Sequence, residues 1–204
     1  MAQVFVLSTG RCGSTTLAAS CAHITNHTSG HETNWGRLGD DRLDYPADHI
    51  EVDNRLSWFL GPLAARYPDA RYVHLVRDRR QVVDSFLKRW PWDPPAGRFG
   101  LPRLVGRATG RLTGGVVATS ILPAFAYQVT GRKDPIPVSE RPVVAGHYVD
   151  TVTANIEAFV EGRPHRRVEL ESLAEDLPDL WAWMGAEGDL DAAVAELTVR
   201  HNAS

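Results

Sequence analysis

The residues from Val4 to Leu17 constrain the fold more than any other part of the chain, and they read VFVLSTGRCGSTTL. The first four, Val4 to Leu7, form an apolar run of branched and aromatic residues that is typical of a buried strand. Gly10 and Gly13 allow backbone angles that a side chain would disfavour. We therefore expect a strand, a tight glycine-containing loop and a helix, in that order.

The loop is a candidate anion-binding site because a helix is expected to begin directly after it. The apolar residues Leu17, Cys21 and Ile24 fall on one face of that helix. The first N–H groups of a helix have no partner within the helix, and the helix dipole is positive at this end, so a phosphate is the expected ligand. An ordinary turn between a strand and a helix is the alternative. The helix opens with three hydroxyl-bearing residues, Ser14, Thr15 and Thr16.

The loop differs from the common nucleoside-triphosphate loop. That motif ends in Gly-Lys-Ser or Gly-Lys-Thr, and its lysine reaches the outer phosphates. Here Gly13 is followed by Ser14, and the nearest cation is Arg11, inside the loop. A guanidinium can bind two oxygens of a phosphate or a sulfate at once. The sequence therefore predicts a phosphate-bearing donor other than ATP.

A second strand and helix are expected between Arg71 and Trp90. The residues from Tyr72 to Val76 have the pattern of a buried strand. Asp78, followed three residues later by Gln81, forms a capping-box pattern. A helix is therefore expected to begin immediately after Asp78.

Arg77 and Ser85 are the polar residues of this segment that most suggest ligand binding. Arg77 stands at the end of the predicted strand, and Ser85 lies about two helical turns later. Ligands of open α/β sheets bind outside the carboxyl ends of the strands. We therefore expect Arg77 at the same edge of the sheet as the Arg11 loop.

The two segments together resemble the sulfotransferase family. The resemblance is carried by a Gly-Arg-x-Gly-Ser-Thr loop after the first strand, and by a strand ending in arginine with serine eight residues further on. Members of this family use 3′-phosphoadenosine 5′-phosphosulfate (PAPS) as sulfuryl donor. The resemblance implies an α/β fold with a mainly parallel β-sheet flanked by helices, related to that of the P-loop NTPases. We expect one domain, residues 1–204, with 91–133 as a lid or loop region.

The resemblance also implies roles for individual residues. Arg11 would contact the transferring group and stabilise charge there, so it is also a candidate catalytic residue. Animal cytosolic members have lysine at this place and use a histidine base, whereas carbohydrate and bacterial sulfotransferases have arginine. Arg77 and Ser85 would bind the 3′-phosphate. The loop that would bind the 5′-phosphosulfate comprises Gly10, Arg11, Cys12, Gly13, Ser14, Thr15 and Thr16.

A sulfuryl acceptor needs a base to take its proton. Residues 23–49 are polar, and we expect little regular structure in them. Glu32 is the first candidate base, because related sulfotransferases use a carboxylate that follows the first helix, and His31 is the second. A solvated polar loop is the alternative. Asp53, at the end of a short predicted strand, is either an acceptor-site residue or, as we favour, the N-cap of the next helix.

A metal site could in principle draw on this polar region. His23, His27 and His31 are four residues apart, and Cys21 precedes them. A continuous helix would align the three histidines, but Gly30 and the polar composition argue against one. The sulfotransferase reaction needs no metal, and we expect none.

Residues 91–133 contain six cations and one acid, Asp93, a net charge of +5 in a chain whose total is −3. A basic lid over an anionic donor would explain this asymmetry. A solvated loop whose arginines pair with acids elsewhere is the alternative. Helices are expected around residues 121–125 and over 139–161. The six cations are Arg98, Arg103, Arg107, Arg111, Arg132 and Lys133.

Composition limits the remaining classes. The net charge of −3 argues against broad nucleic-acid binding. No apolar run approaches the length of a membrane span, and the two cysteines form no disulfide framework. We therefore expect a cytoplasmic, bacterial-type protein without an integral membrane segment.

The sequence predicts transfer of a sulfuryl group from PAPS to a hydroxyl or amine. The acceptor would be a small molecule, a carbohydrate or a lipid-linked compound. A P-loop kinase of small molecules or nucleotides is one alternative, and a non-catalytic protein that binds PAPS, or its product 3′,5′-adenosine bisphosphate (PAP), is the other. The acceptor and the oligomeric state stay open.

Overall fold

The computed structural model describes residues 2–89, 121–131 and 136–199. The chain divides into two compact units, one formed by Met1–Val82 with Asp150–Ser204 and the other by Val83–Val149. Most of the predicted lid, residues 91–133, lies outside the described residues. A single domain over 1–204 and the lid both stay predictions.

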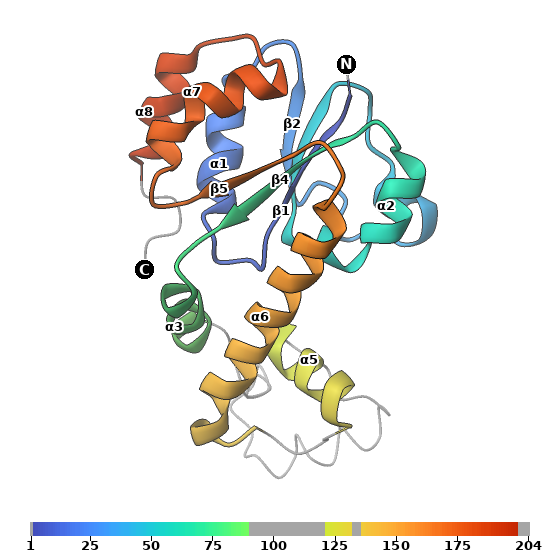
Figure 1. The fold of residues 1–204 in the computed structure, drawn as a ribbon, viewed down its shortest axis with the longest axis vertical. Coiled ribbons are helices and arrows are strands. Elements are labelled where there is room, and N and C mark those ends of the chain that lie inside the picture. The colour runs from blue at the N-terminus through green and yellow to red at the C-terminus, as the bar shows by residue number, and fades with distance from the viewer. Residues whose placement is uncertain (1, 90–120, 132–135, 200–204) are drawn as a thin grey trace, which may run out of the picture. The chain divides into compact units, whose positions relative to one another are not determined.

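A five-stranded, entirely parallel sheet forms the centre of the first unit (Figure 1). This confirms the predicted α/β fold with a parallel sheet flanked by helices. The order across the sheet is β2 (Thr28–His31), β3 (His49–Val52), β1 (Val4–Leu7), β4 (Arg71–Val76) and β5 (His165–Glu169).

Strand β1 lies in the middle of the sheet, and all four of its residues are buried. Val4 pairs with Ile50 of β3 on one side and with Arg71 of β4 on the other. A central parallel strand is covered on both faces, which explains its uninterrupted apolar sequence. The loop after β1 is therefore anchored to the most buried strand of the unit.

Helices flank the sheet. α1 (Ser14–Cys21) packs against α8 (Leu190–Leu197), which also contacts α7 (Leu173–Met184), and α2 (Leu60–Arg66) lies away from these three on the other side of the sheet (Figure 1). The described residues also contain the short 3₁₀ helices η1 (Gly39–Leu43) and η2 (Asn54–Trp58) in this unit and η3 (Val138–Glu140) in the second. Among the described residues, no helix is both long and apolar enough to cross a bilayer.

The second unit is helical where it is described. It contains α5 (Ile121–Thr130) and parts of α3 (Arg79–Arg89) and α6 (Arg141–Val160), two helices that begin or end in the first unit. Its aromatic core brings Phe86, Phe125 and Tyr148 together, and the Tyr148 ring centroid lies 5.5 Å from each of the other two. The helices predicted around 121–125 and over 139–161 are confirmed.

One expectation about the fold is wrong. Residues 23–49 contain the edge strand β2, where we expected little regular structure. The sequence of this strand, TSGH, has neither a branched apolar run nor an alternating pattern. β2 is instead held by its ladder to β3 and by a contact of 2.8 Å between Thr28 Oγ1 and His49 Nδ1.

Candidate active site

The carboxyl ends of the five strands meet at one edge of the sheet, because all five are parallel. This edge gathers the segments in which the sequence placed most of its candidate residues. In an open α/β sheet it is also the edge at which ligands bind. The segments are 8–13 after β1, Glu32 after β2, Asp53 after β3, Arg77 after β4 and 170–171 after β5.

The loop after β1 has the backbone that its glycines predict. Gly10 and Gly13 have φ angles of 81° and 83°, and Arg11 also has a positive φ, 61°. Gly13 caps α1, which begins at Ser14 as expected. A side chain at Gly13 would also collide with Leu170 in the segment after β5. The loop therefore needs glycine here for its conformation, and an added Cβ would require the Leu170 side chain to move.

Inside the loop, hydroxyl and thiol groups support the backbone. Gly10 N–H donates to Ser8 Oγ over 3.2 Å, and Thr9 Oγ1 donates to the Gly10 carbonyl over 3.0 Å. Cys12 Sγ lies 3.3 Å from Thr9 Oγ1, and burial raises the pKa of this thiol. The Cys12 side chain is thus a neutral support of the loop.

Arg77 lies against this loop, as predicted. Its Nη1 donates to the Arg11 carbonyl over 3.3 Å, and its Nη2 donates to Gln81 Oε1 over 2.8 Å. Its Nε is buried and has no hydrogen-bond partner among the described residues. Gln81 N–H in turn donates to Asp78 Oδ1 over 2.9 Å, so Asp78 caps the helix as expected and α3 begins at Arg79. A guanidinium beside the candidate anion-binding loop, with a buried Nε that is unpartnered in the described part of the chain, is suited to a second anionic group.

His31 also reaches the loop. It is the last residue of β2, and its Nε2 lies 3.1 Å from Oγ of Ser14, the first residue of α1. The edge strand that the sequence did not reveal therefore brings the second candidate base to the loop.

Glu32 follows β2 and has a left-handed backbone with φ of 52°. Its N–H donates to the Val52 carbonyl over 3.1 Å. Its carboxylate forms an ion pair with Arg55 and has 26% of its side-chain surface exposed. The Arg55 guanidinium also lies over the Trp35 ring, 5.7 Å from its centroid. Glu32 is thus held in place and still accessible to a molecule at this edge.

Asp53 caps η2, which confirms the interpretation we favoured. Its Oδ1 accepts a hydrogen bond of 2.7 Å from Arg55 N–H, and its Oδ2 accepts one of 2.5 Å from Arg42 Nη2. Its side chain is completely buried, and burial raises its pKa while Arg42 opposes that rise. Both oxygens already have partners, so the geometry favours a structural role over a role in acceptor binding.

Three other candidates complete the comparison with the sequence. Thr15 and Thr16 lie in the first turn of α1 and are partly exposed. Ser85 lies on the part of α3 that belongs to the second unit, and its role in binding stays a prediction.

No group of three or more histidine, cysteine or acidic residues among those described could hold a metal ion. The histidines of the polar region have different neighbours. His23 Nε2 lies 3.6 Å from Glu196 Oε2, and His27 Nδ1 lies 2.9 Å from Asn26 Oδ1.

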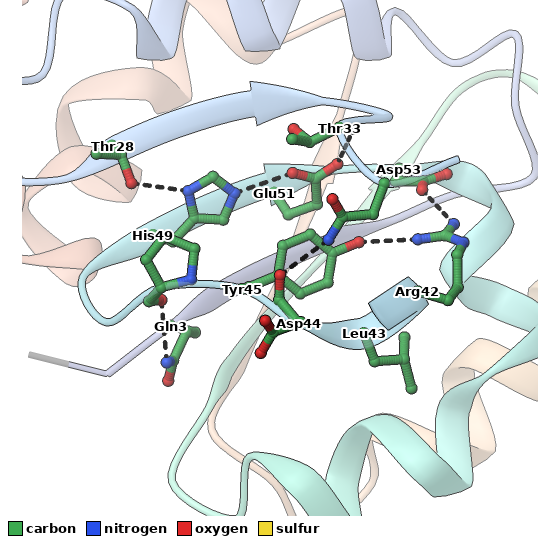
Figure 2. A network of polar contacts seen from close by, with 12 residues as sticks. Gln3, Thr28, Thr33, Arg42, Leu43, Asp44, Tyr45, His49, Glu51 and Asp53 are labelled. Atoms are coloured by element: carbon green, nitrogen blue, oxygen red, sulfur yellow. Dashed lines mark hydrogen bonds and ion pairs between the residues drawn. The ribbon is translucent and has the colours of Figure 1, made fainter. Parts of the chain in front are cut away.

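Sequence reasoning missed a buried polar network around β3, shown in Figure 2. His49 Nε2 lies 2.9 Å from Glu51 Oε2, and Arg42 Nη1 donates to the Tyr45 hydroxyl over 2.9 Å. The polar residues His49 and Glu51 of β3 and Asp53, which follows it, alternate along the chain, and this is a detectable signal. Its meaning depends on β3 being an inner strand, because only there must charged side chains be paired.

Comparison with known proteins finds similarity of structure and none of sequence. No protein-family model matches the chain, and no curated protein matches its sequence. Among solved structures, the crystal structure of mouse sulfotransferase SULT7A1 complexed with PAP matches with a TM-score of 0.55 and 10% sequence identity. The match covers 97% of this chain and 65% of the mouse chain. The chain has a sulfotransferase-like fold. At this identity the likeness shows the fold alone.

Proposed function

We propose that this protein is a sulfotransferase that transfers a sulfuryl group from PAPS to a hydroxyl or amine. The observation that carries the proposal is Arg77, which contacts the Arg11 carbonyl at the carboxyl edge of the sheet and has a buried Nε without a partner among the described residues. A loop for one phosphate with a guanidinium beside it suits a donor with two separate anionic groups.

The loop after β1 and Arg77 suit the two ends of such a donor. The loop N–H groups and Ser14 would bind the 5′-phosphate at the start of α1. Arg11 would contact the transferring sulfuryl group, and Arg77 with Ser85 would bind the 3′-phosphate. The 3′-phosphate distinguishes PAPS from ATP, and the loop lacks the lysine that binds the outer phosphates of ATP.

The reaction is an in-line displacement at sulfur. The acceptor oxygen forms a bond to sulfur while the bond from sulfur to the bridging oxygen of the donor breaks, and PAP leaves with that electron pair. Arg11 would stabilise the charge that develops on the bridging oxygen. Like phosphoryl transfer, this chemistry depends mainly on positioning and on charge stabilisation.

Glu32 would accept the proton of the acceptor. Its carboxylate is accessible, and Arg55 fixes its place. His31 already contacts Ser14, so it is better placed to orient that hydroxyl. We infer an acceptor among small molecules, carbohydrates and lipid-linked compounds, a cytoplasmic location, and a closer kinship to the arginine-loop enzymes of bacteria and of carbohydrate metabolism.

Label transfer tests the proposal directly. Sulfur-labelled PAPS and γ-phosphorus-labelled ATP are each incubated with the protein and the same panel of phenols, sugars, amines and lipid-linked alcohols. We expect label to move from PAPS and not from ATP. Transfer from ATP alone would establish a kinase and refute the proposal. PAPS binding without transfer to any acceptor would favour the non-catalytic alternative.

The base is tested with Glu32→Gln and His31→Gln side by side. We expect Glu32→Gln to lower kcat by about 10²-fold or more and His31→Gln by much less, while both variants still bind PAP. Normal turnover in Glu32→Gln would remove Glu32 from the reaction.

A further inference from the structure

Strand β3 and the residue that follows it carry two completely buried carboxylates, Glu51 and Asp53. They are two residues apart and therefore project to the same face of the strand. Burying a charged group is unfavourable, and an apolar pair of similar volume often stabilises a protein as well or better. The two carboxylates therefore suggest a role beyond holding the sheet together.

Glu51 connects the start of β2 with the turn that follows its end (Figure 2). Its Oε2 lies 2.9 Å from His49 Nε2, and His49 Nδ1 lies 2.8 Å from Thr28 Oγ1. Its Oε1 accepts a hydrogen bond of 2.7 Å from the backbone N–H of Thr33, the residue after Glu32. Both oxygens of the carboxylate thus have partners, and one of them holds the backbone beside the candidate base.

The turn at Glu32 needs such support. A residue other than glycine in a left-handed conformation is strained, and it persists when its surroundings determine it. Besides the Glu51 bond, Glu32 N–H donates to Val52 O over 3.1 Å and Trp35 N–H donates to Glu32 O over 3.2 Å. A side chain at Gly30 would collide with Thr33 Oγ1 and lie 2.8 Å from Glu51 Oε2, so Thr33 and Glu51 are packed tightly against β2.

Asp53 supports the side chain of Glu32 through Arg55. It accepts the Arg55 N–H and so fixes the start of η2. The Arg55 side chain pairs with the Glu32 carboxylate. The Glu32 backbone is therefore held through Glu51, and its carboxylate is held through Arg55.

We propose that Glu51, kept in place by His49, is a positioning residue that directs the Glu32 carboxylate toward the acceptor. The inference rests on the proposed function, because it concerns the base of that reaction. Glu51 is buried and touches no substrate. It acts through the backbone N–H of Thr33, which donates a hydrogen bond to the Glu51 carboxylate.

The first test compares Glu51→Leu with Glu51→Gln. Leucine removes the acceptor for Thr33 N–H, whereas glutamine keeps it. A base displaced by about 1 Å can lose about 10²-fold in rate, so we expect Glu51→Leu to lower kcat at least tenfold and Glu51→Gln to retain most of it. PAP affinity should stay unchanged in both variants. Equal kcat values for wild type and Glu51→Leu would overturn the inference.

A matched control separates positioning from stability. Ser20→Ala removes a buried hydrogen bond of 2.8 Å to the Ala193 carbonyl, between α1 and α8. We expect it to lower Tm without lowering kcat. If Glu51→Leu does not fold, Gly30→Ala disturbs the same contact from the edge strand. Its control is Gly36→Ala, where the added Cβ would meet nothing within 4 Å.

A double-mutant cycle with Glu32→Gln distinguishes an action of Glu51 through Glu32 from a purely structural role. If Glu51 acts only through Glu32, Glu51→Leu should lower the residual kcat of Glu32→Gln by less than about twofold. The same loss in both backgrounds would indicate a purely structural role and would overturn the inference.

Hydrogen exchange at the Thr33 amide needs no activity. We expect exchange at least tenfold faster in Glu51→Leu than in wild type, and protection retained in Glu51→Gln. An unchanged exchange rate of the Thr33 amide in Glu51→Leu would overturn this inference but not the proposed function. If the wild-type protein transferred no sulfuryl group from PAPS, the proposed function would be refuted. The measured protection of the Thr33 amide by Glu51 would still stand.

Discussion

Arg11 and Glu32 are two of the three described residues other than glycine with a positive φ, and both are candidates for the reaction. Each conformation costs about 1 kcal/mol, so neighbouring contacts must maintain it. Arg11 lies between left-handed Gly10 and the cap Gly13, and Glu32 is held by β3. Backbone strain thus occurs where the proposed donor and acceptor would meet.

Replacing Gly13 tests the loop. Gly13→Ala introduces both a disfavoured φ and a collision with Leu170, and we expect a loss of stability of about 1–3 kcal/mol with weaker PAP binding. Gly39→Ala is the matched control, because Gly39 has a φ of 61° but open space around its Cα. It should destabilise less and leave PAP affinity unchanged. Equal effects of the two variants on PAP affinity, measured by calorimetry, would contradict the account.

The sequence predicted some site residues and missed others for a clear reason. Arg77 beside the Arg11 loop follows from two parallel strands whose carboxyl ends share an edge. The contacts of Glu51 with Thr33 and of Asp53 with Arg42 join segments whose proximity is set by tertiary packing. No local pattern encodes them, although the alternating polar residues of β3 mark the place.

Among the elements, apolar strands were predictable and the polar edge strand was not. β1 is buried and apolar, and β4 is mostly so, which is why their sequences identify them. β2 has two exposed and two partly exposed residues and forms because β3 offers it a free edge. Its end carries His31 and leads into Glu32, so both candidate bases depend on the element that was hardest to predict.

Strand β4 also makes stability depend on pH. His74 is 2% exposed, and burial, with smaller contributions from Arg167 and His165, lowers its pKa from 6.5 to about 4. Between these two values the unfolded chain binds a proton that the folded chain does not. Stability should therefore be unaffected by His74 above pH 6.5 and fall below it, by up to about 1.4 kcal/mol per pH unit, until about pH 4.

His74→Leu should remove this part of the acid sensitivity. Urea unfolding measured from neutral pH down to about pH 4 would show a smaller loss of stability in the variant than in wild type. Parallel curves over the whole range would show that His74 does not carry the effect.

At the scale of the whole molecule, the sheet and its helices form one unit that holds Arg11, Glu32 and Arg77 together. Ser85 belongs to the other unit, and most of the basic segment lies outside the described residues. The proposed base, Glu32, and the proposed 5′-phosphate loop therefore belong to one unit. The contribution of Ser85 is still to be measured.

The central claim is that this edge recognises a nucleotide with a 3′-phosphate. Isothermal titration calorimetry with PAP, beside 5′-AMP and ATP, tests it most directly, with Arg77→Ala as the variant. The account predicts that PAP binds at least about tenfold more tightly than either control and that Arg77→Ala removes this preference, because charge-assisted hydrogen bonds to a guanidinium contribute about 1.5–3 kcal/mol. ATP binding as tightly as PAP, or an Arg77→Ala variant that still prefers PAP, would contradict it.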